Sequence, residues 1–309
     1  MSSDLTQKGL VYVVLLNWNG WRDTITCLNS LSHLDYPVYN ILVVDNGSTD
    51  DSAGRLRAVF PDISLLETGI NLGFSGGCNA GIRCAFAHGA EYVWLLNNDT
   101  TVDSRALQAM IAMAESDERL GAVGSVLYWM KEPNRIQVWG GGWVSFWTGR
   151  SGHHYSPVPA HQLHYVTGAS LLLRRNALDD IGLLDDNTFF MYWEDVDLCF
   201  RLRKRGWRLA VAEDSIILHK QAASTGGNNP TLAFYGARSS LRFFLRHSPL
   251  PTWTIAIGTM GRLFKQLLRL QGRQMVAVIK GTCFGGKYKH IRTPYTQEEQ
   301  HRLTSVNKT

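Results

Sequence analysis

A single carboxylate stands among amides and hydroxyls at residues 97–101, where the chain reads NNDTT and the acid is Asp99. The apolar run Tyr92–Leu96 directly precedes it and has the length and composition of a strand buried on both faces. Carboxylate, amide and hydroxyl oxygens are the ligands that Mg²⁺ and Mn²⁺ prefer, and these ions usually accompany phosphorylated substrates. The alternative is structural, because Asn and Asp are common turn residues and Thr can cap a following helix.

Two further polar segments follow apolar runs in this half of the chain. Asp45 ends the run Ile41–Val44, where its carboxylate can accept a hydrogen bond from a nucleobase or a ribose, or simply cap the next turn. The glycine-rich stretch Asn71–Gly81 opens a predicted helix, which suits either a bound diphosphate or a tight helix–strand contact. The carboxyl ends of parallel strands meet at one edge of a sheet, so Asp45, Asn71 and Asp99 are expected to lie together.

A candidate general base lies at the start of a predicted helix, in the segment Trp193-Glu194-Asp195. Acids at a helix start and bases at its end also suit the helix dipole, which is the structural interpretation. A helix N-terminus lowers the pKa of a carboxylate, whereas a partly desolvated site raises it. The aromatic residues of the segment 189–193 occur together with these acids, as a sugar-binding site requires, so we favour Asp195 as a general base.

Histidines offer further candidate ligands. His219 follows the apolar run Ile216–Leu218 and is either a hydrogen-bonded residue at the edge of the core or a neutral imidazole that completes a metal site beside Asp99. The histidines of the loop 153–164 match no zinc spacing, and we interpret them as surface or acceptor-side residues.

The order of the elements predicts an α/β protein. Strand-like runs alternate with helix-like runs up to residue 114, the pattern of a parallel sheet. We place soft boundaries near residues 120 and 230. Between these boundaries the segments predicted to be extended are Val123–Trp129, Ile136–Trp143, Leu163–Leu173, Trp207–Val211 and Ile216–Leu218, and Glu194–Arg205 is predicted to be a helix. Helical periodicity returns over Thr231–Leu245 and Thr254–Ile279.

Composition places the chain among folded proteins of a reducing compartment. The chain has 309 residues, of which 45% are hydrophobic, and its five cysteines have no zinc or redox spacing. We expect no signal peptide, because Met1–Gly9 is polar. The formal net charge is +5, and from Arg238 onward only Glu298 and Glu299 oppose many basic residues. This asymmetry indicates an anionic surface as a partner, and the absence of a recognisable nucleic-acid module favours a membrane over nucleic acid.

The predicted helix Thr254–Ile279 is basic and amphipathic. Arg262, Lys265, Arg269 and Arg273 would form one helical stripe, and apolar residues fill much of the rest. The charges exclude a transmembrane span. Binding to an anionic bilayer and packing onto the catalytic domain are the two interpretations that remain open.

Taken together, the motifs resemble inverting glycosyltransferases of family 2, which have the GT-A fold, and the similarity is closest to bacterial rhamnosyltransferases. The similar elements run in family order over about two-thirds of the chain. They are LNWNG at 16–20, VVDNGSTDDS at 43–52, NLGFSGGCNAGI at 71–82, LLNNDT at 95–100, VTGASLLLRR at 166–175 and FFMYWEDVDLCFRLRKRGWRL at 189–209.

The resemblance implies a Rossmann-like, mostly parallel central sheet flanked by helices, and a role for each matching residue. Residues 1–120 would form the nucleotide-sugar-binding half, 121–230 the acceptor-binding and catalytic half, and 231–309 a helical basic extension. Asp195 is implied as the catalytic base and Asp99 and His219 as ligands of Mg²⁺ or Mn²⁺; Asn97 stands where the family's metal motif has its first acid. The remaining implied contacts are Asn17, Asp45, Asn71, Gly73, Asn79, Asn97 and Asn98 with the donor nucleotide-sugar, and Trp193 and Glu194 with the acceptor.

The implied reaction is transfer of a sugar with inversion onto a hydroxyl of a saccharide or lipid-linked saccharide in bacterial cell-surface polysaccharide synthesis. By resemblance the donor is dTDP-L-rhamnose; UDP- and GDP-sugars remain open, because Asp45 cannot distinguish thymine from uracil. The implied location is cytoplasmic, peripheral on the inner face of the cell membrane. The alternatives are a sugar nucleotidyltransferase, which usually needs a lysine that residues 71–81 lack, and a non-catalytic sugar-binding protein.

Overall fold

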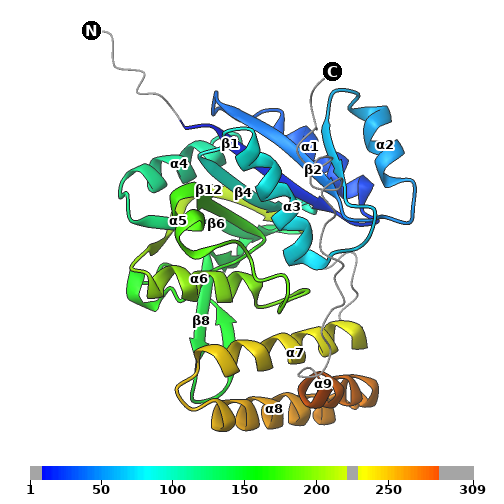
Figure 1. Ribbon diagram of the computed structural model, residues 1–309, viewed down its shortest axis with the longest axis vertical. Helices are drawn as coiled ribbons and strands as arrows, with labels where there is room; N and C mark the ends of the chain where they lie inside the picture. The colour runs from blue at the N-terminus through cyan, green and yellow to red at the C-terminus, as the bar shows by residue number, and fades with distance from the viewer. Residues whose placement is uncertain (1–8, 221–228, 285–309) are drawn as a thin grey trace.

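A large mixed sheet with helices packed against it forms the body of the protein, and three helices extend beyond it at the bottom of the view (Figure 1). The computed structural model describes residues 9–220 and 229–284. The first half alternates strands and helices, which confirms the α/β prediction. Its elements are β1 (Val11–Asn17), α1 (Trp21–Leu31), β2 (Tyr39–Asp45), α2 (Ser52–Val59), β3 (Ser64–Glu67), α3 (Gly73–Ala87), β4 (Tyr92–Asn97), β5 (Thr100–Val102) and α4 (Ala106–Glu115).

The register of the parallel strands brings their polar ends to one edge of the sheet. The strand order begins β3-β2-β1-β4, and these neighbours are parallel. Asn17 pairs with Asp45, and Leu16 pairs with Asn97. The candidate residues at the ends of β1, β2 and β4 therefore share this edge, as the sequence predicts.

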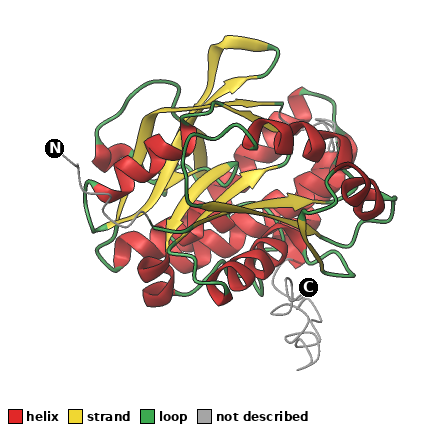
Figure 2. Ribbon diagram, turned by 90° about the horizontal axis from the view of Figure 1, so that it is seen from above, coloured by secondary structure: helices red, strands yellow, loops and turns green. Residues whose placement is uncertain are grey.

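The central strands are apolar on both faces because helices cover both faces of the sheet (Figure 2). In β1, Val11, Val13 and Leu15 join one buried cluster, whereas Tyr12 and Val14 join the cluster on the opposite face. Successive side chains of a strand point to opposite faces, so a continuous apolar run is what such a strand needs.

The second half extends the same sheet and adds a small one. Its elements are β6 (Leu120–Trp129), β7 (Glu132–Trp139), β8 (Gly141–Ser145), β9 (Arg150–His153), the 3₁₀ turn η1 (Ala160–Gln162), β10 (Tyr165–Val166), β11 (Ser170–Arg174), α5 (Arg175–Ile181), α6 (Glu194–Lys204) and β12 (Arg208–His219). Beyond β4 the order is β11-β6-β12-β5, in which β11 and β5 are antiparallel to their neighbours. Strands β8, β9 and β10 form a separate three-stranded sheet.

Several predicted strands have different bounds in the structure. The run Ile136–Trp143 is not one strand, because the chain leaves the large sheet at Gly140, where φ is +68° and a Cβ would collide with Val211. The run Leu163–Leu173 is likewise divided between β10 and β11. In contrast, the two strands predicted around residues 207–218 are the single strand β12, which contains a bulge opposite β6.

The C-terminal helices are α7 (Pro230–His247), α8 (Pro251–Leu268) and α9 (Gly272–Phe284). The prediction of one helix over Thr254–Ile279 is wrong, because the chain turns between α8 and α9, with Leu270 at a φ of +54°. Arg273 therefore lies on α9 and does not continue the stripe that Arg262 and Lys265 form on α8 and that Arg269 extends at its C-terminal cap. Among the described helices, none combines the length and the hydropathy that crossing a bilayer would require.

A buried carboxylate anchors these helices to the catalytic half. Asp197 on α6 is fully buried and accepts hydrogen bonds from Arg201, from Arg246 and from the His247 ring, at 2.8, 2.9 and 2.8 Å. Removing one partner of such a buried charged network usually costs about 3–5 kcal/mol. The position of α7 is therefore tied to that of α6.

Candidate active site

Asp99 and His219 meet beyond the end of β4. The Asp99 Oδ1 atom lies 3.2 Å from Nε2 of His219, which ends β12. The other ring nitrogen of His219, Nδ1, lies 2.6 Å from the Gln137 Oε1 atom, and the Asn97 amide nitrogen lies 3.4 Å from Nε2. With Gln137 as acceptor, Nδ1 carries the hydrogen and the Nε2 lone pair faces the carboxylate.

This arrangement fits a divalent cation. A neutral imidazole lone pair and a carboxylate repel each other unless a proton or a cation lies between them, and metal-bound histidines usually donate their second N–H to a neighbouring oxygen, as His219 does to Gln137. Among the described residues no group of three or more His, Cys, Asp or Glu side chains could hold a metal. A Mg²⁺ or Mn²⁺ ion here would thus take few ligands from the protein and the others from substrate phosphates and water.

Asn17 and Asp45 form one buried network at the ends of β1 and β2. The Asn17 amide donates to Asp45 Oδ1 at 2.7 Å, and the Ser48 hydroxyl donates to the same oxygen at 2.6 Å. Thr24 donates to the Asn17 oxygen at 2.9 Å, and Asn98 donates to the Thr24 hydroxyl at 2.8 Å. Side chains from three strand ends are therefore linked, and each is held in one orientation.

The other predicted donor contacts are engaged with the protein itself. Asn71 accepts a hydrogen bond from the Gly73 N–H at 2.8 Å. Gly73 has a φ of +75° and a Cβ there would collide with the Phe190 carbonyl, which accepts from the N–H of the next residue, Phe74. Asn79 is buried and exchanges two hydrogen bonds with the backbone of Leu184. These contacts fix α3 against residues 184–190, and a role of the three residues in donor binding stays a prediction.

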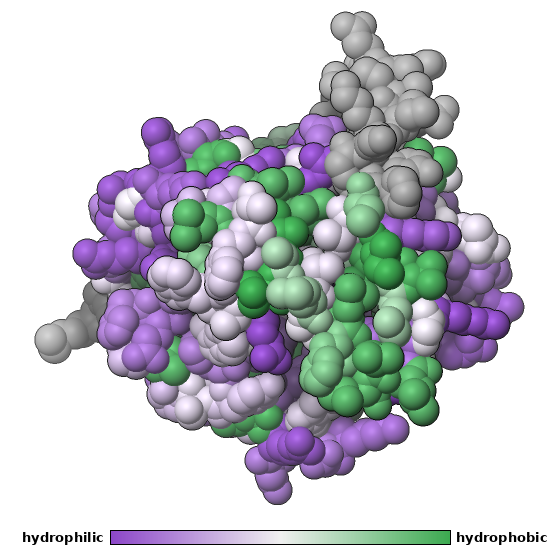
Figure 3. All heavy atoms as spheres, turned by 90° about the horizontal axis from the view of Figure 1, so that it is seen from below, coloured by the Kyte–Doolittle hydropathy of each residue, from purple (hydrophilic) through white to green (hydrophobic). Residues whose placement is uncertain are grey.

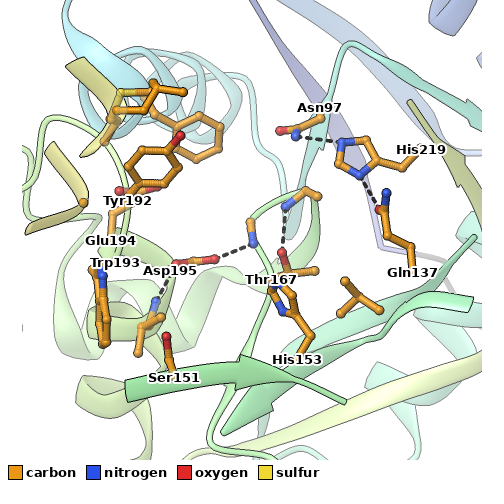
Figure 4. A pocket seen from close by; sticks show the side chains of 18 of the residues that line it. Asn97, Gln137, Ser151, His153, Thr167, Tyr192, Trp193, Glu194, Asp195 and His219 are labelled. Carbon is orange, nitrogen blue, oxygen red and sulfur yellow. Dashed lines mark hydrogen bonds between the residues drawn. The ribbon is translucent and has the colours of Figure 1, made fainter. Parts of the chain in front are cut away.

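Asp195 is held by backbone N–H groups at the start of α6. Its Oδ2 atom accepts from the Gly168 N–H at 2.8 Å, and its Oδ1 atom accepts from the Val196 N–H at 2.8 Å (Figure 4). Burial raises the pKa of the Asp195 carboxyl, and these hydrogen bonds only partly oppose that effect. Desolvation therefore outweighs the helix terminus, which gives the carboxylate the stronger basicity that a general base needs.

Backbone strain positions this acid. Tyr192 and Trp193 both have left-handed φ values, +67° and +69°, immediately before α6. Such conformations cost about 1–3 kcal/mol each for residues other than glycine and persist where packing enforces them. Trp193 is held by Phe243 and Phe244 of α7, at ring-centroid distances of 4.9 and 5.2 Å.

Glu194 is buried beside Asp195, and its Oε2 atom has no hydrogen-bond partner among the described residues. Burial, and next the charge of Asp195, raise the pKa of the Glu194 carboxyl well above its ordinary value. Two adjacent desolvated carboxyls do not ionise together easily, so Glu194 is the one expected to hold a proton.

We expect Glu194→Gln to increase stability at alkaline pH. Because the folded-state pKa of Glu194 is raised, its contribution to stability is complete at acid pH and is lost as the pH rises through that pKa. Gln keeps the shape of the protonated acid, so the variant should match the wild type near about pH 4, below the ordinary pKa of glutamate, and exceed it by about 1 kcal/mol or more near about pH 9. Thermal unfolding at both pH values measures this, and an equal difference at the two values would contradict it.

One pocket of about 950 Å³ joins these groups. The predicted site residues that line this pocket are Asn97, Asn98, Asp99, Trp193, Glu194, Asp195 and His219. The predicted site residues that do not line it are Asn17, Asp45, Asn71, Gly73 and Asn79. Gln137 and the N–H of Gly168 were not predicted from the sequence. Tyr165, whose hydroxyl lies 3.1 Å from the ring of His153 and which lines the pocket with Asp195, was not singled out either. The similar element at 166–175 contains Gly168, but no signal marked Gln137.

Comparison with known proteins identifies the family. The family model for glycosyl transferase family 2 matches residues 12–182, which is more than half of the chain. The chain belongs to glycosyl transferase family 2. An N-acetylglucosaminyl-diphospho-decaprenol L-rhamnosyltransferase of Mycobacterium tuberculosis is 29% identical over 287 residues, which cover 82% of this chain and 92% of that protein.

Solved structures confirm the GT-A fold. A mannosyltransferase from Pyrobaculum calidifontis, solved with GDP-Man and Mn²⁺, superposes with a TM-score of 0.58 at 16% identity and covers 90% of this chain and 88% of that one. GalNAc-T7, solved with UDP, GalNAc and Mn²⁺, gives a TM-score of 0.62 at 12% identity, covering 88% of this chain and 55% of that one. This glycosyltransferase therefore carries its polar strand ends on the fold that its sequence predicts.

Proposed function

We propose that this glycosyltransferase uses a divalent cation and transfers L-rhamnose from dTDP-L-rhamnose, with inversion, to a hydroxyl of a lipid-linked saccharide. The observation that carries the proposal is that Asp195, a desolvated base, lines the same pocket as Asp99 and His219. A base and a diphosphate site in one pocket are what a direct displacement at an anomeric carbon needs.

In this mechanism Asp195 accepts the proton of the acceptor hydroxyl as its oxygen attacks the anomeric carbon. The bond from that carbon to the donor diphosphate breaks on the opposite side, so the configuration inverts. Gly168 and Val196 keep the Asp195 carboxylate aimed while it accepts the proton. Asp99 and His219 would hold Mg²⁺ or Mn²⁺, and the ion would neutralise charge on the leaving nucleoside diphosphate.

The identity of the donor rests on two lines of support. The mycobacterial relative is named as an L-rhamnosyltransferase. Asp45, fixed by Asn17 and Ser48, lies at the strand edge where it can meet the N3–H of a pyrimidine. A UDP-sugar satisfies the second line equally well, and a GDP-sugar satisfies neither, so dTDP-L-rhamnose is the donor that both support.

The lipid-linked acceptor is supported by the same relative, whose name specifies a decaprenol diphosphate. Helices α8 and α9 also suit a peripheral position on the cytoplasmic face of a membrane. Residues 230–284 contain no acidic residue, and Trp253, Met260, Phe264, Leu267 and Leu268 of α8 are all more than half exposed. Basic and apolar side chains together favour binding at an anionic bilayer.

A donor screen tests the proposed function. We expect dTDP-L-rhamnose with Mn²⁺ to raise the melting temperature more than UDP- or GDP-sugars do, because a ligand that binds the folded state stabilises it. Chelation with EDTA should abolish most of the shift. Release of dTDP on addition of a lipid-linked saccharide would then identify transfer; release of pyrophosphate would identify a nucleotidyltransferase instead.

A further inference from the structure

The pocket that holds Asp195 also reaches the C-terminal helices. Lys265, Gln266 and Arg269 of the α8 region line it, together with Gln271 and Gln274. Asn229, Leu232, Ala233 and Gly236 of the α7 region lie along the same pocket. The pocket thus runs from the Asp99–His219 pair past Asp195 to a polar, cationic region that the donor diphosphate, placed beside Asp99, does not need.

Contacts of α8 show which of its faces is turned toward the body of the protein. Thr254 donates to the carbonyl of Phe146 at 2.6 Å, and Gly258 approaches the Gly149 carbonyl so closely that it leaves no room for a Cβ. An α-helix has 3.6 residues per turn, so Arg262 and Gln266 continue the face that begins with Thr254 and Gly258. Lys265 and Arg269 lie within the arc that these four residues span. The exposed apolar residues of α8 lie away from this face, and Figure 3 shows hydrophobic side chains gathered on the lower surface of the molecule.

The cations of this face lack anionic partners in the described part of the chain. Lys265 and Arg269 form no ion pair with any residue that the structure describes, whereas Arg201 and Arg246 are paired with Asp197. The Arg262 Nε atom and the Gln266 Oε1 atom are buried without a hydrogen-bond partner among the described residues. Burial lowers the pKa of the Arg262 guanidinium to about 10. Lys265 and Arg269 are exposed and line the pocket without an ion pair, so an anionic ligand in the pocket can form charge-assisted hydrogen bonds with them.

We propose that Lys265 and Arg269 form a second anion subsite, which binds the phosphate or diphosphate that joins the acceptor saccharide to its lipid. This inference rests on the proposed function and specifies its acceptor as a sugar ester of a lipid phosphate. The saccharide would extend from this subsite to Asp195, and the lipid would leave along the exposed apolar face of α8. A pocket of about 950 Å³ is at the upper end of the usual range for ligand sites, as expected for two substrates.

The test measures binding of farnesyl diphosphate in EDTA, which removes the cation that the donor site is proposed to need. We expect the variant Lys265→Ala/Arg269→Ala to bind farnesyl diphosphate at least about tenfold more weakly than the wild type, because the variant lacks two charge-assisted contacts with the diphosphate. The control variant Arg273→Ala/Lys280→Ala removes two exposed cations of α9 that do not line the pocket, and it should bind like the wild type.

Further measurements separate this subsite from the donor site and from the bilayer. The melting-temperature shift with dTDP-L-rhamnose and Mn²⁺ should be the same in both double variants and the wild type, so a failure of the proposed donor would appear in all three proteins. Farnesol should bind much more weakly than farnesyl diphosphate, and the pocket variant should still bind anionic vesicles. Unchanged farnesyl diphosphate affinity in the pocket variant, equal affinity for farnesol, or an equal loss of vesicle binding would each overturn the proposal.

Discussion

Replacement of Asp195 by asparagine should lower kcat for sugar transfer by about 10²–10⁴-fold, the usual contribution of one general base. The oxygen of the introduced amide can still accept the hydrogen bond that the Gly168 N–H donates, whereas its NH2 group cannot accept from the Val196 N–H, so the side chain should stay in place with one hydrogen bond fewer. The amide cannot take a proton from the acceptor hydroxyl. Nucleotide-sugar binding, measured as a melting-temperature shift, should therefore match the wild type while the rate of transfer falls.

The neighbouring acid supplies the matched control for this prediction. Glu194→Gln changes the adjacent buried carboxyl, which we expect to be protonated already, so its kcat should fall much less than that of Asp195→Asn. The raised pKa of Asp195 also predicts that kcat rises with pH above the range in which an ordinary aspartate titrates, and that the Asp195→Asn variant loses this dependence. Full activity of Asp195→Asn would remove the residue from the mechanism.

The strand ends of this site could be predicted from the sequence because their positions follow from the sheet. Short apolar runs identify the buried strands, and the carboxyl ends of parallel strands share one edge. The pairing of Asn17 with Asp45 and of Leu16 with Asn97 confirms that step. Asp99 and His219 lie far apart in the sequence, yet each follows an apolar strand, so their meeting was predictable as well.

Features that depend on tertiary packing could not be predicted in this way. Gln137 lies on a partly exposed antiparallel strand with no distinctive neighbours, and only the pairing of β7 with β6 brings it to His219. The turn that separates α8 from α9 has Leu270, a good helix former, at its left-handed position, so periodicity predicted one helix. That error also concealed the position of Lys265 and Arg269 beside the pocket, because one continuous stripe suggested a membrane-facing surface.

Replacement of Asp99 by asparagine should lower metal-dependent activity by about 10²-fold or more. Loss of an outer partner of a metal ligand usually costs about 10–100-fold in affinity or activity, and loss of a ligand itself should cost at least as much. The introduced amide would keep the shape of the side chain but not the negative charge that faces His219 Nε2. The measurement is the Mn²⁺ concentration needed for half-maximal transfer, together with the rate at saturating Mn²⁺.

Gln137→Leu provides a graded comparison for the Asp99 variant. It leaves both proposed ligands in place but removes the acceptor that orients the His219 ring, so its loss should fall within about 10–100-fold, below that of Asp99→Asn. If the ion only screens the leaving diphosphate from solution, neither substitution should change the Mn²⁺ requirement. If Gln137→Leu proved more damaging than Asp99→Asn, Asp99 would be excluded as the principal metal ligand, since the orientation of the ring would then matter more than the charge of the carboxylate.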